Sequence, residues 1–440
     1  MAGETVALAR YAASLRFEDL PAEIVQKAKG VIADTVAAAI CGAALPWSEI
    51  VIRYAERRGP GGSSAILGRG TAVQAWAAAL ANGALAHAFE LDSLTRPGAG
   101  AHPGATVLPP ALAVAQQEGA GGRALIAAFV AGNEVMIRIG RATHHTNEAR
   151  GFHAPGTTGP FGAAVAAGHL YGLDAEAMTN AIGIAGSLAG GLLEFARGDG
   201  GMVKRLHLGR ASEGGVLAAS LAQDGFQGPR TVIEGEFGFL RVFCTEWDEG
   251  ELTRGLGSEY RLATTVLKRY PCHATAHAAV RAVSEMKAEH GFSGEEVERI
   301  EVTGDARTVS RHNIAEPADL MLAQYSLPFC VALALFRDPR DPRSFDAGAL
   351  ANPQIRALCR RVRLVPERGG QAAGASTVRL EVAGGRHFEK HVASGMLGPG
   401  ELEDKFLRLS WPGLGEGAVA LYNRLMRLED EESLDWLTGA

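Results

Sequence analysis

The chain has 440 residues with a formal net charge of −6, and hydrophobic residues make up 47% of it. This length predicts two or three domains around a sizeable core, and the composition is typical of a folded globular protein rather than a disordered one. The mild acidity argues against a nucleic-acid-binding protein.

The five cysteines are scattered and form no Cys-x-x-Cys pair. This favours free thiols in a reducing compartment and excludes a recognisable zinc-ribbon or iron–sulfur motif. The residues from Met1 to Arg10 lack the basic and apolar regions of a secretory signal, and no apolar run reaches the roughly 18 residues of a membrane span. We therefore expect a cytoplasmic protein that does not cross a membrane.

The first half of the chain predicts an α-helical bundle. Asp19 is a candidate N-cap, and apolar residues at helical spacing continue from Ile24 to Ala39 before Gly42 ends the run. Ala-rich segments, whose small side chains permit close helix packing, follow this first helix. They cover residues 74–87, 107–117, 123–141, 159–171, 175–190 and 210–223.

The pattern changes after about residue 260. Two segments of alternating hydrophobicity flank Ala383-Gly384-Gly385-Arg386, which indicates a β-hairpin. The predicted strands are 299–303, 361–365, 377–382 and 387–392, and the predicted helices between them are 275–289 and 320–336.

We therefore predict a mainly α protein with two domains. A large all-helical bundle domain covers residues 1–265 and returns at 398–440, so that it is discontinuous, and a smaller α+β lid domain covers residues 266–397. We expect the acidic run 429–432 in the returning segment to be a solvated helix face.

The first candidate motif places two acids and a histidine around one helix end. Glu90 and Asp92 follow a helix that ends near His87, and His102 precedes the next helix. A carboxylate beside a histidine fixes its tautomer and raises its basicity, so Asp92 and His102 could transfer protons. The alternative is a polar helix end beside a structural loop histidine.

The second motif runs from Gly151 to Gly162 into an Ala-rich helix. Backbone N–H groups, the hydroxyl of Thr157 and the helix dipole favour an anion there, and a carboxylate beside His153 is the natural ligand. The motif lacks the Lys-Ser/Thr of a nucleotide-binding loop. A capped helix start explains it equally well.

The third motif is basic. Lys204, Arg205, His207 and Arg210 lie within seven positions and could clamp a polyanion, or they could form a solvated turn.

The fourth motif contains Lys268 and His273, which are candidate acid, base or carboxylate-binding groups. His273 and His277 have the spacing of two metal ligands on a helix face. Ala274, however, stands where an HExxH metal motif has its Glu, and we therefore predict no metal site.

These motifs, in this order, resemble the MmgE/PrpD family, which includes 2-methylcitrate dehydratase, cis-aconitate decarboxylase and iminodisuccinate epimerase. The resemblance covers nearly the whole chain. It runs through Asp34-Thr35-Val36-Ala37-Ala38, Asn82…His87…Asp92…His102-Pro103-Gly104, His153…Gly156-Thr157…Gly159…Phe161-Gly162, Lys204-Arg205-Leu206-His207, Lys268…Tyr270-Pro271-Cys272-His273, Ser326-Leu327-Pro328-Phe329 and Glu401-Leu402…Lys405-Phe406.

The resemblance implies a large helical domain plus an α+β lid, usually as a homodimer, with the active site in the cleft between them. It also implies a small polycarboxylic acid substrate and neither a metal nor an organic cofactor. The implied site positions are Glu90, Asp92, His102, His153, Lys204, Lys268 and His273. One stretch departs from the family, which often has Asp-Phe-Asp-Asp-Thr where this chain has Glu90-Leu91-Asp92-Ser93-Leu94.

We predict a cofactor-independent lyase, similar to 2-methylcitrate dehydratase, that acts on a di- or tricarboxylic acid through a carbanion next to a carboxylate. An epimerase or a decarboxylase would use the same carbanion. Two further hypotheses are a metallohydrolase built on His273 and His277 and a polycarboxylate-binding protein without turnover. The predicted catalytic residues are Asp92, His102, His153, Lys268 and His273, and the predicted substrate-binding residues are Glu90, Thr157, Lys204 and Arg205.

Overall fold

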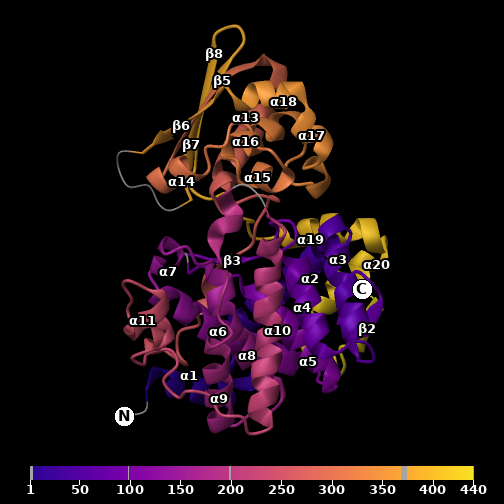
Figure 1. Ribbon diagram of the computed structural model, residues 1–440. Helices are drawn as coiled ribbons and strands as arrows, with labels where there is room; N and C mark the ends of the chain where they lie inside the picture. Colours follow the sequence, from indigo (N-terminus) through magenta and orange to yellow (C-terminus); the bar gives the residue numbers. More distant parts are fainter. Residues whose placement is uncertain (1–2, 98, 198–199, 368–373, 440) are drawn as a thin grey trace. The chain divides into compact units, whose positions relative to one another are not determined.

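The computed structural model describes residues 3–97, 99–197, 200–367 and 374–439 (Figure 1). Helices dominate and the strands form small sheets, which confirms the predicted mainly α class. The chain divides into two compact units. The first unit comprises Met1–Ala88, Asp92–Val266 and Leu402–Ala440, and the second comprises Phe89–Leu91 and Leu267–Glu401.

Helix α2 (Ala22–Ala43) lies in the core of the first unit, because its apolar residues are buried on nearly every side. The predicted N-cap of this helix is wrong. Pro21 precedes the first turn, whereas the Asp19 carboxylate accepts a hydrogen bond from the backbone N–H of Arg16 at 3.1 Å. Proline at this point already has a backbone φ suited to a helix start, so no side-chain cap is needed.

Small residues allow the central helices of the first unit to approach closely. A Cβ atom added at Gly162 of α8 (Ala154–Leu170) would lie 2.8 Å from the carbonyl oxygen of Gly132 in α6 (Gly122–Ala142). Glycine at both positions therefore lets the two backbones meet. The other helices of this unit are α1 (Glu4–Ser14), α3 (Pro46–Arg58), α4 (Ala75–Ala86), α5 (Pro103–Gln117), α7 (Thr146–Ala149), α9 (Ala175–Gly186), α10 (Val203–Gln223), α11 (Phe239–Phe243), α12 (Gly250–Thr253), α19 (Leu402–Leu414) and α20 (Gly417–Leu425).

Two helices of the first unit begin earlier than the sequence predicts. Helix α8 starts at Ala154 rather than at residue 159, with Pro155 in its first turn, and α10 starts at Val203 rather than at residue 210. The second motif from Ala154 onwards and the basic residues of the third motif therefore lie on helices and not in loops. Packing of α8 against α10 and α6, and of α10 against α4, stabilises these first turns despite their glycines.

Two antiparallel strand pairs join distant parts of the first unit. Strand β1 (Ser64–Ile66) pairs with β2 (Thr71–Val73), and β3 (Leu94–Thr95) pairs with β4 (Thr265–Val266). The second pair brings the chain just after Asp92 beside the chain just before Leu267.

The second unit contains a four-stranded sheet of order β6-β5-β7-β8. Strand β5 is parallel to β6 and antiparallel to β7, and β7 and β8 form the predicted hairpin. Side chains of β7 alternate between buried and more exposed, as a sheet with one covered face requires, and α13 packs against it. The strands are β5 (Val297–Gly304), β6 (Val362–Pro366), β7 (Ser376–Val382) and β8 (Arg386–Val392).

One predicted helix of the second unit is interrupted. The segment 320–336 forms two helices because Ser326 caps the second one, accepting a hydrogen bond from the N–H of Phe329 at 2.9 Å, and Pro328 follows in its first turn. The helices of this unit are α13 (His277–His290), α14 (Ala306–Arg311), α15 (Leu320–Tyr325), α16 (Leu327–Phe336), α17 (Ala347–Ala351) and α18 (Pro353–Cys359).

The C-terminal segment returns to the first unit through buried ion pairs. Helix α19 packs on α2, where Lys405 pairs with the buried Asp34. Glu429 pairs with the buried Lys29 of α2 at 2.6 Å. The expectation of a solvated acidic face at residues 429–432 is therefore wrong for Glu429.

In the part of the chain that the structure describes, no single helix is long and apolar enough to cross a membrane. Helices α2 and α3 satisfy the length and composition requirements only as a pair, bent by 97°.

Candidate active site

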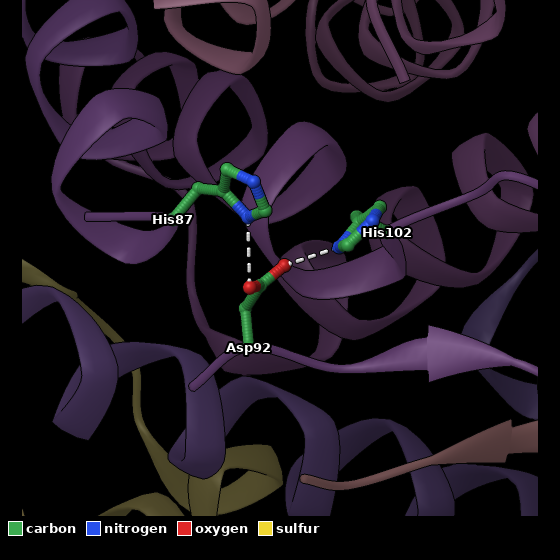
Figure 2. A group of neighbouring side chains, drawn as sticks. All are labelled: His87, Asp92 and His102. Carbon is green, nitrogen blue, oxygen red and sulfur yellow. Dashed lines mark hydrogen bonds and ion pairs between the residues drawn. The ribbon is translucent and has the colours of Figure 1, made fainter. Parts of the chain in front are cut away.

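The carboxylate of Asp92 joins two histidines inside the first unit (Figure 2). His87 follows the last turn of α4 and its Nδ1 lies 2.8 Å from Asp92 Oδ1. His102 precedes α5 and its Nδ1 lies 2.6 Å from Asp92 Oδ2. His87 and Asp92 are fully buried, whereas the His102 side chain is 16% exposed. The structure thus confirms the contact of Asp92 with His102 and adds His87.

The charge states of this group follow from its burial. Burial alone would raise the pKa of Asp92, but the charges and hydrogen bonds of His87 and His102 outweigh it and hold the pKa well below its usual value. Burial lowers the pKa of His87 well below its usual value, and the charge of Lys204 adds to this shift while Asp92 opposes it. The arrangement is therefore an ionised Asp92 that accepts Nδ1–H from a neutral His87.

His153 lies in the same region of the first unit. It precedes α8, and its Nδ1 is 3.0 Å from Nδ1 of His207 in α10. Burial lowers the pKa of His153 well below its usual value, and a positive charge on any of the nearby His87, His207 or His102 rings would lower it further. Two facing Nδ1 atoms can share only one proton in a hydrogen bond, so at least one of the two rings is neutral.

The predicted basic residues lie in the first turn of α10, and both are buried. The Arg205 guanidinium binds two backbone carbonyl groups. Its Nε donates to the carbonyl oxygen of Ala88 at 3.1 Å, and its Nη1 donates to the carbonyl oxygen of Gly201 at 2.6 Å. Burial lowers the pKa of His207 as it does that of His87, and the positive charge of Lys204 lowers both further. Lys204 is thus a buried cation beside the histidine cluster.

Thr157 lies inside the first turn of α8 and is fully buried. Its hydroxyl donates to the Ala154 carbonyl at 3.0 Å and accepts from Nδ2 of Asn147 at 3.2 Å. These bonds make it a fixed part of the helix start, and its predicted role in substrate binding stays a prediction.

The second unit holds the other predicted residues. Lys268 Nζ lies 2.8 Å from Glu90 Oε2, and both side chains are only 2% exposed. Glu90 has a backbone φ of +58°, a left-handed conformation that is strained for this residue type. The side-chain amide of Gln324 donates to the carbonyls of Phe89 at 3.1 Å and of Pro271 at 2.9 Å, which ties the Glu90 segment to the segment after Lys268.

His273 is held among aromatic rings of the second unit. Its ring stacks on His312 with centroids 4.2 Å apart and lies 5.0 Å from Tyr325, and its Nδ1 is 3.0 Å from the hydroxyl of Thr275. His312 and Tyr325 escaped the sequence analysis, because their spacing to His273 carries no recognisable pattern.

The predicted residues therefore gather in two groups. The first unit brings together Asp92, His102, His153 and Lys204 with His87 and His207, which the motifs contain but which were not among the predicted site residues. The second unit brings together Glu90 and Lys268, and His273 lies five residues further along the chain.

One group also has the composition of a metal site. The potential ligand atoms of His87, Asp92 and His102 all lie within 4.8 Å of one another. Among the described residues this is the only such group of three or more, so His273 and His277 find no third acidic, histidine or cysteine ligand there. In the His87–Asp92–His102 group, the Nδ1 atoms of both histidines are already hydrogen-bonded to Asp92. Proton transfer is therefore a simpler role for this group than metal binding.

Comparison with known proteins gives a consistent result across the chain. The model of the MmgE/PrpD N-terminal domain matches residues 6–251, and that of the MmgE/PrpD C-terminal domain matches residues 270–420.

Curated relatives include a cis-aconitate decarboxylase of Aspergillus terreus, which is 32% identical over 298 residues, or 65% of this chain and 60% of the relative. A cis-aconitate decarboxylase of Homo sapiens is 28% identical over 366 residues, or 80% of this chain and 74% of the relative. The chain thus aligns with about three fifths of the length of the fungal relative.

Proposed function

Because this chain belongs to the MmgE/PrpD family, we propose that it is a lyase that removes carbon dioxide from cis-aconitate or a similar tricarboxylic acid. The observation that carries this proposal is the ionised Asp92, which accepts hydrogen bonds from two histidines beside the buried Lys204. Such a cluster suits a reaction in which a proton and negative charge move at carbon.

The reaction needs one proton for each turnover. In cis-aconitate, the bond between the methylene carbon and the carboxylate that it carries breaks. The electron pair of this bond forms a new C=C bond between the methylene carbon and the central carbon. The electron pair of the original C=C bond takes a proton at the far carbon. Carbon dioxide and 2-methylenebutanedioic acid are the products.

We assign the proton donor to His102. Asp92 accepts its Nδ1–H and orients the ring, which leaves the other ring nitrogen to deliver the proton. His102 is also the member of the group with some exposure. Lys204 stabilises the negative charge that develops on the substrate.

Dehydration of a hydroxy-tricarboxylic acid is the second candidate. It needs a base that removes a proton next to a carboxylate, and the lowered pKa of His153 keeps this ring neutral and able to accept one. Lys268 and His273 remain predicted catalytic residues in either reaction, and a homodimer remains the predicted assembly.

The test follows carbon dioxide release and product formation when purified protein is incubated in D2O with cis-aconitate, citrate or 2-methylcitrate. We expect release of carbon dioxide from cis-aconitate alone and one deuterium in the product. Water loss from a hydroxy acid without carbon dioxide release would favour the second candidate. Activity that a chelator abolishes and only a divalent metal restores would contradict cofactor independence.

A further inference from the structure

The ring of His273 caps the short 3₁₀ helix η4 (Ala274–Ala276). Its side chain accepts a hydrogen bond from the backbone N–H of Thr275, as the side chain of an N-cap residue does, with 3.5 Å between that nitrogen and Nδ1. The hydroxyl of the same Thr275 lies 3.0 Å from Nδ1. Two polar groups of one residue are therefore directed at a single nitrogen of the His273 ring.

These contacts determine where a neutral His273 carries its proton. A backbone N–H can only donate, so the Nδ1 atom that accepts it has no proton of its own. The hydroxyl of Thr275 can donate or accept, and beside an unprotonated Nδ1 it donates. The single proton of the neutral ring is therefore on Nε2. His102 has the opposite tautomer, because its Nδ1 donates to the carboxylate of Asp92.

A second ring fixes the plane of the His273 ring. His312 stacks on it with centroids 4.2 Å apart and 26° between the two planes. The carbonyl oxygen of Tyr325 can only accept, so the Nδ1 atom of His312, which lies 2.9 Å from it, carries a proton. Like charges repel at the separation of the two rings, so at most one of them is positively charged. His312 therefore holds its neighbour in place, and a proton on either ring opposes a proton on the other.

The backbone of His273 is anchored as well. Its N–H donates to the carbonyl oxygen of Gln324 at 2.9 Å, and its carbonyl oxygen accepts from the N–H of Ala276 at 3.0 Å. The side-chain amide of Gln324 also donates to the carbonyl of Pro271, two residues before His273. With the backbone, the ring plane and the tautomer fixed, the direction of the Nε2–H bond is set before a substrate binds.

We propose that Thr275 and His312 are positioning residues that hold His273 as a neutral donor, with its proton on Nε2. In this form His273 donates a hydrogen bond to a carboxylate oxygen of the substrate. It does not remove a proton from carbon, because the nitrogen that could accept one is occupied by Thr275. The proposal rests on the proposed decarboxylation for the identity of the substrate, and it leaves proton delivery to His102.

Nuclear magnetic resonance of the full chain, labelled with ¹⁵N at histidine, reads the tautomer without turnover. Ring nitrogens with and without a proton differ widely in ¹⁵N chemical shift, and the signals that disappear in His273→Gln identify this ring. We expect an unprotonated Nδ1 and a protonated Nε2 at neutral pH. A protonated Nδ1 in the unaltered protein would overturn the proposal.

A matched set of threonine variants tests the role of the hydroxyl. Thr275→Val removes it at nearly unchanged shape, so we expect the His273 signals to move towards a mixture of both tautomers, because only the longer backbone contact remains. Thr275→Ser should restore the original signals. Thr179→Val is the control, since its buried hydroxyl donates to the Ala175 carbonyl at 2.7 Å within α9. Identical His273 signals in Thr275→Val and the unaltered chain would show that Thr275 does not set the tautomer.

Two replacements of His312 test the stacked ring. His312→Phe keeps an aromatic ring beside His273, whereas His312→Ala removes it. We expect KM for cis-aconitate to rise by at least about tenfold in His312→Ala and by less than about threefold in His312→Phe, with circular dichroism showing that both chains are folded. The same KM in both variants would contradict the role of the stack.

Two replacements of His273 separate a hydrogen-bond donor from a base. His273→Gln keeps an N–H donor but has no basic nitrogen, and His273→Phe has neither. We expect Gln to retain at least about one tenth of kcat/KM and Phe to retain at most about one hundredth. Equal losses would show that His273 acts as a base and would overturn the proposal. A chain with the Nε2–H tautomer that releases no carbon dioxide from cis-aconitate would support the tautomer and contradict the proposed function alone.

Discussion

The carboxylate of Asp92 accepts hydrogen bonds from His87 and His102, so its charge determines the tautomer of both rings. Asp92→Asn keeps the side-chain volume but removes this charge, and we expect kcat to fall by about 100-fold or more. Asp248→Asn, at an exposed aspartate paired with Arg254, serves as the control and should leave kcat unchanged. A kcat within threefold of the unaltered protein, at unchanged folding, would contradict the role of Asp92.

The buried neutral His153 predicts that stability falls with acidity. Its pKa in the folded chain lies below the ordinary value of about 6.5, so the unfolded chain binds the proton more readily as the pH falls below 6.5. This contribution is fully present above pH 6.5 and is lost below it, by about 1.4 kcal/mol for each pH unit. The urea midpoint should therefore be lower at pH 5.5 than at pH 7. His153→Asn should reduce this difference and the exposed His387→Asn should not.

The Glu90–Lys268 pair predicts strong coupling, because removal of either charge leaves the other one buried. Glu90→Gln and Lys268→Met should each lower the free energy of unfolding by about 3–5 kcal/mol. The double variant should lose much less than the sum of the two, and urea denaturation measures all three. Additive losses would show that the two groups act independently.

The sequence allowed Asp92 and His102 to be predicted as a contact because they flank one short loop. It gave no sign that His207 would meet His153, since the two rings belong to different helices and are brought together only by the packing of α8 and α10. His87 was visible in the first motif, but only the fold shows that Asp92 uses its second oxygen for this ring. The catalytic roles of these residues stay predictions.

At the scale of helices, the close approach of α6 and α8 depends on glycine. A Cβ atom at Gly162 would lie 2.7 Å from Cβ of Met136 and 2.8 Å from the Gly132 carbonyl oxygen, so Gly162→Ala should lower the free energy of unfolding by about 1–3 kcal/mol. Gly417→Ala is the control, because its Cβ atom would meet only Leu414 at 3.9 Å. Equal urea midpoints for the two variants would contradict this account of the packing.

Helix interiors and the β7–β8 hairpin were predictable because their apolar periodicity matches the surfaces that they bury. The first residues of the helices were harder to predict. Glycine and proline near Ala154 suggested a loop, whereas packing on neighbouring helices stabilises the first turn of α8. The break at Ser326 was missed because the apolar pattern continues on both sides of it.

At the scale of the whole molecule, the pair between Lys405 and Asp34 fixes the returning segment on α2. Lys405→Met leaves the Asp34 carboxylate buried without this cation and should lower the free energy of unfolding by about 3–5 kcal/mol. Arg408→Met, on the same helix but in a surface pair with Asp404, should cost at most about 0.5 kcal/mol. If urea denaturation showed that both variants lose the same free energy of unfolding, the buried pair would not stabilise the fold more than the surface pair does.

The mainly α class with a smaller α+β part was predictable, because the change from helical to alternating periodicity is visible near residue 260. The sequence did not allow us to predict that Phe89–Leu91 belongs to the second unit. The amide of Gln324, a residue far along the chain, donates to the Phe89 carbonyl, and Lys268 pairs with Glu90, so contacts distant in sequence join this segment to the second unit.

The long sequence separation of Asp34 and Lys405 has a consequence for biosynthesis. The two residues are 371 positions apart, and at a ribosomal rate of roughly 5–20 residues per second the lysine is made on the order of 20–70 s after the aspartate. During this interval the nascent first unit cannot form the mature core around α2. We expect ribosome-bound chains to be open to proteases and chaperones at α2 until residue 405 has left the exit tunnel.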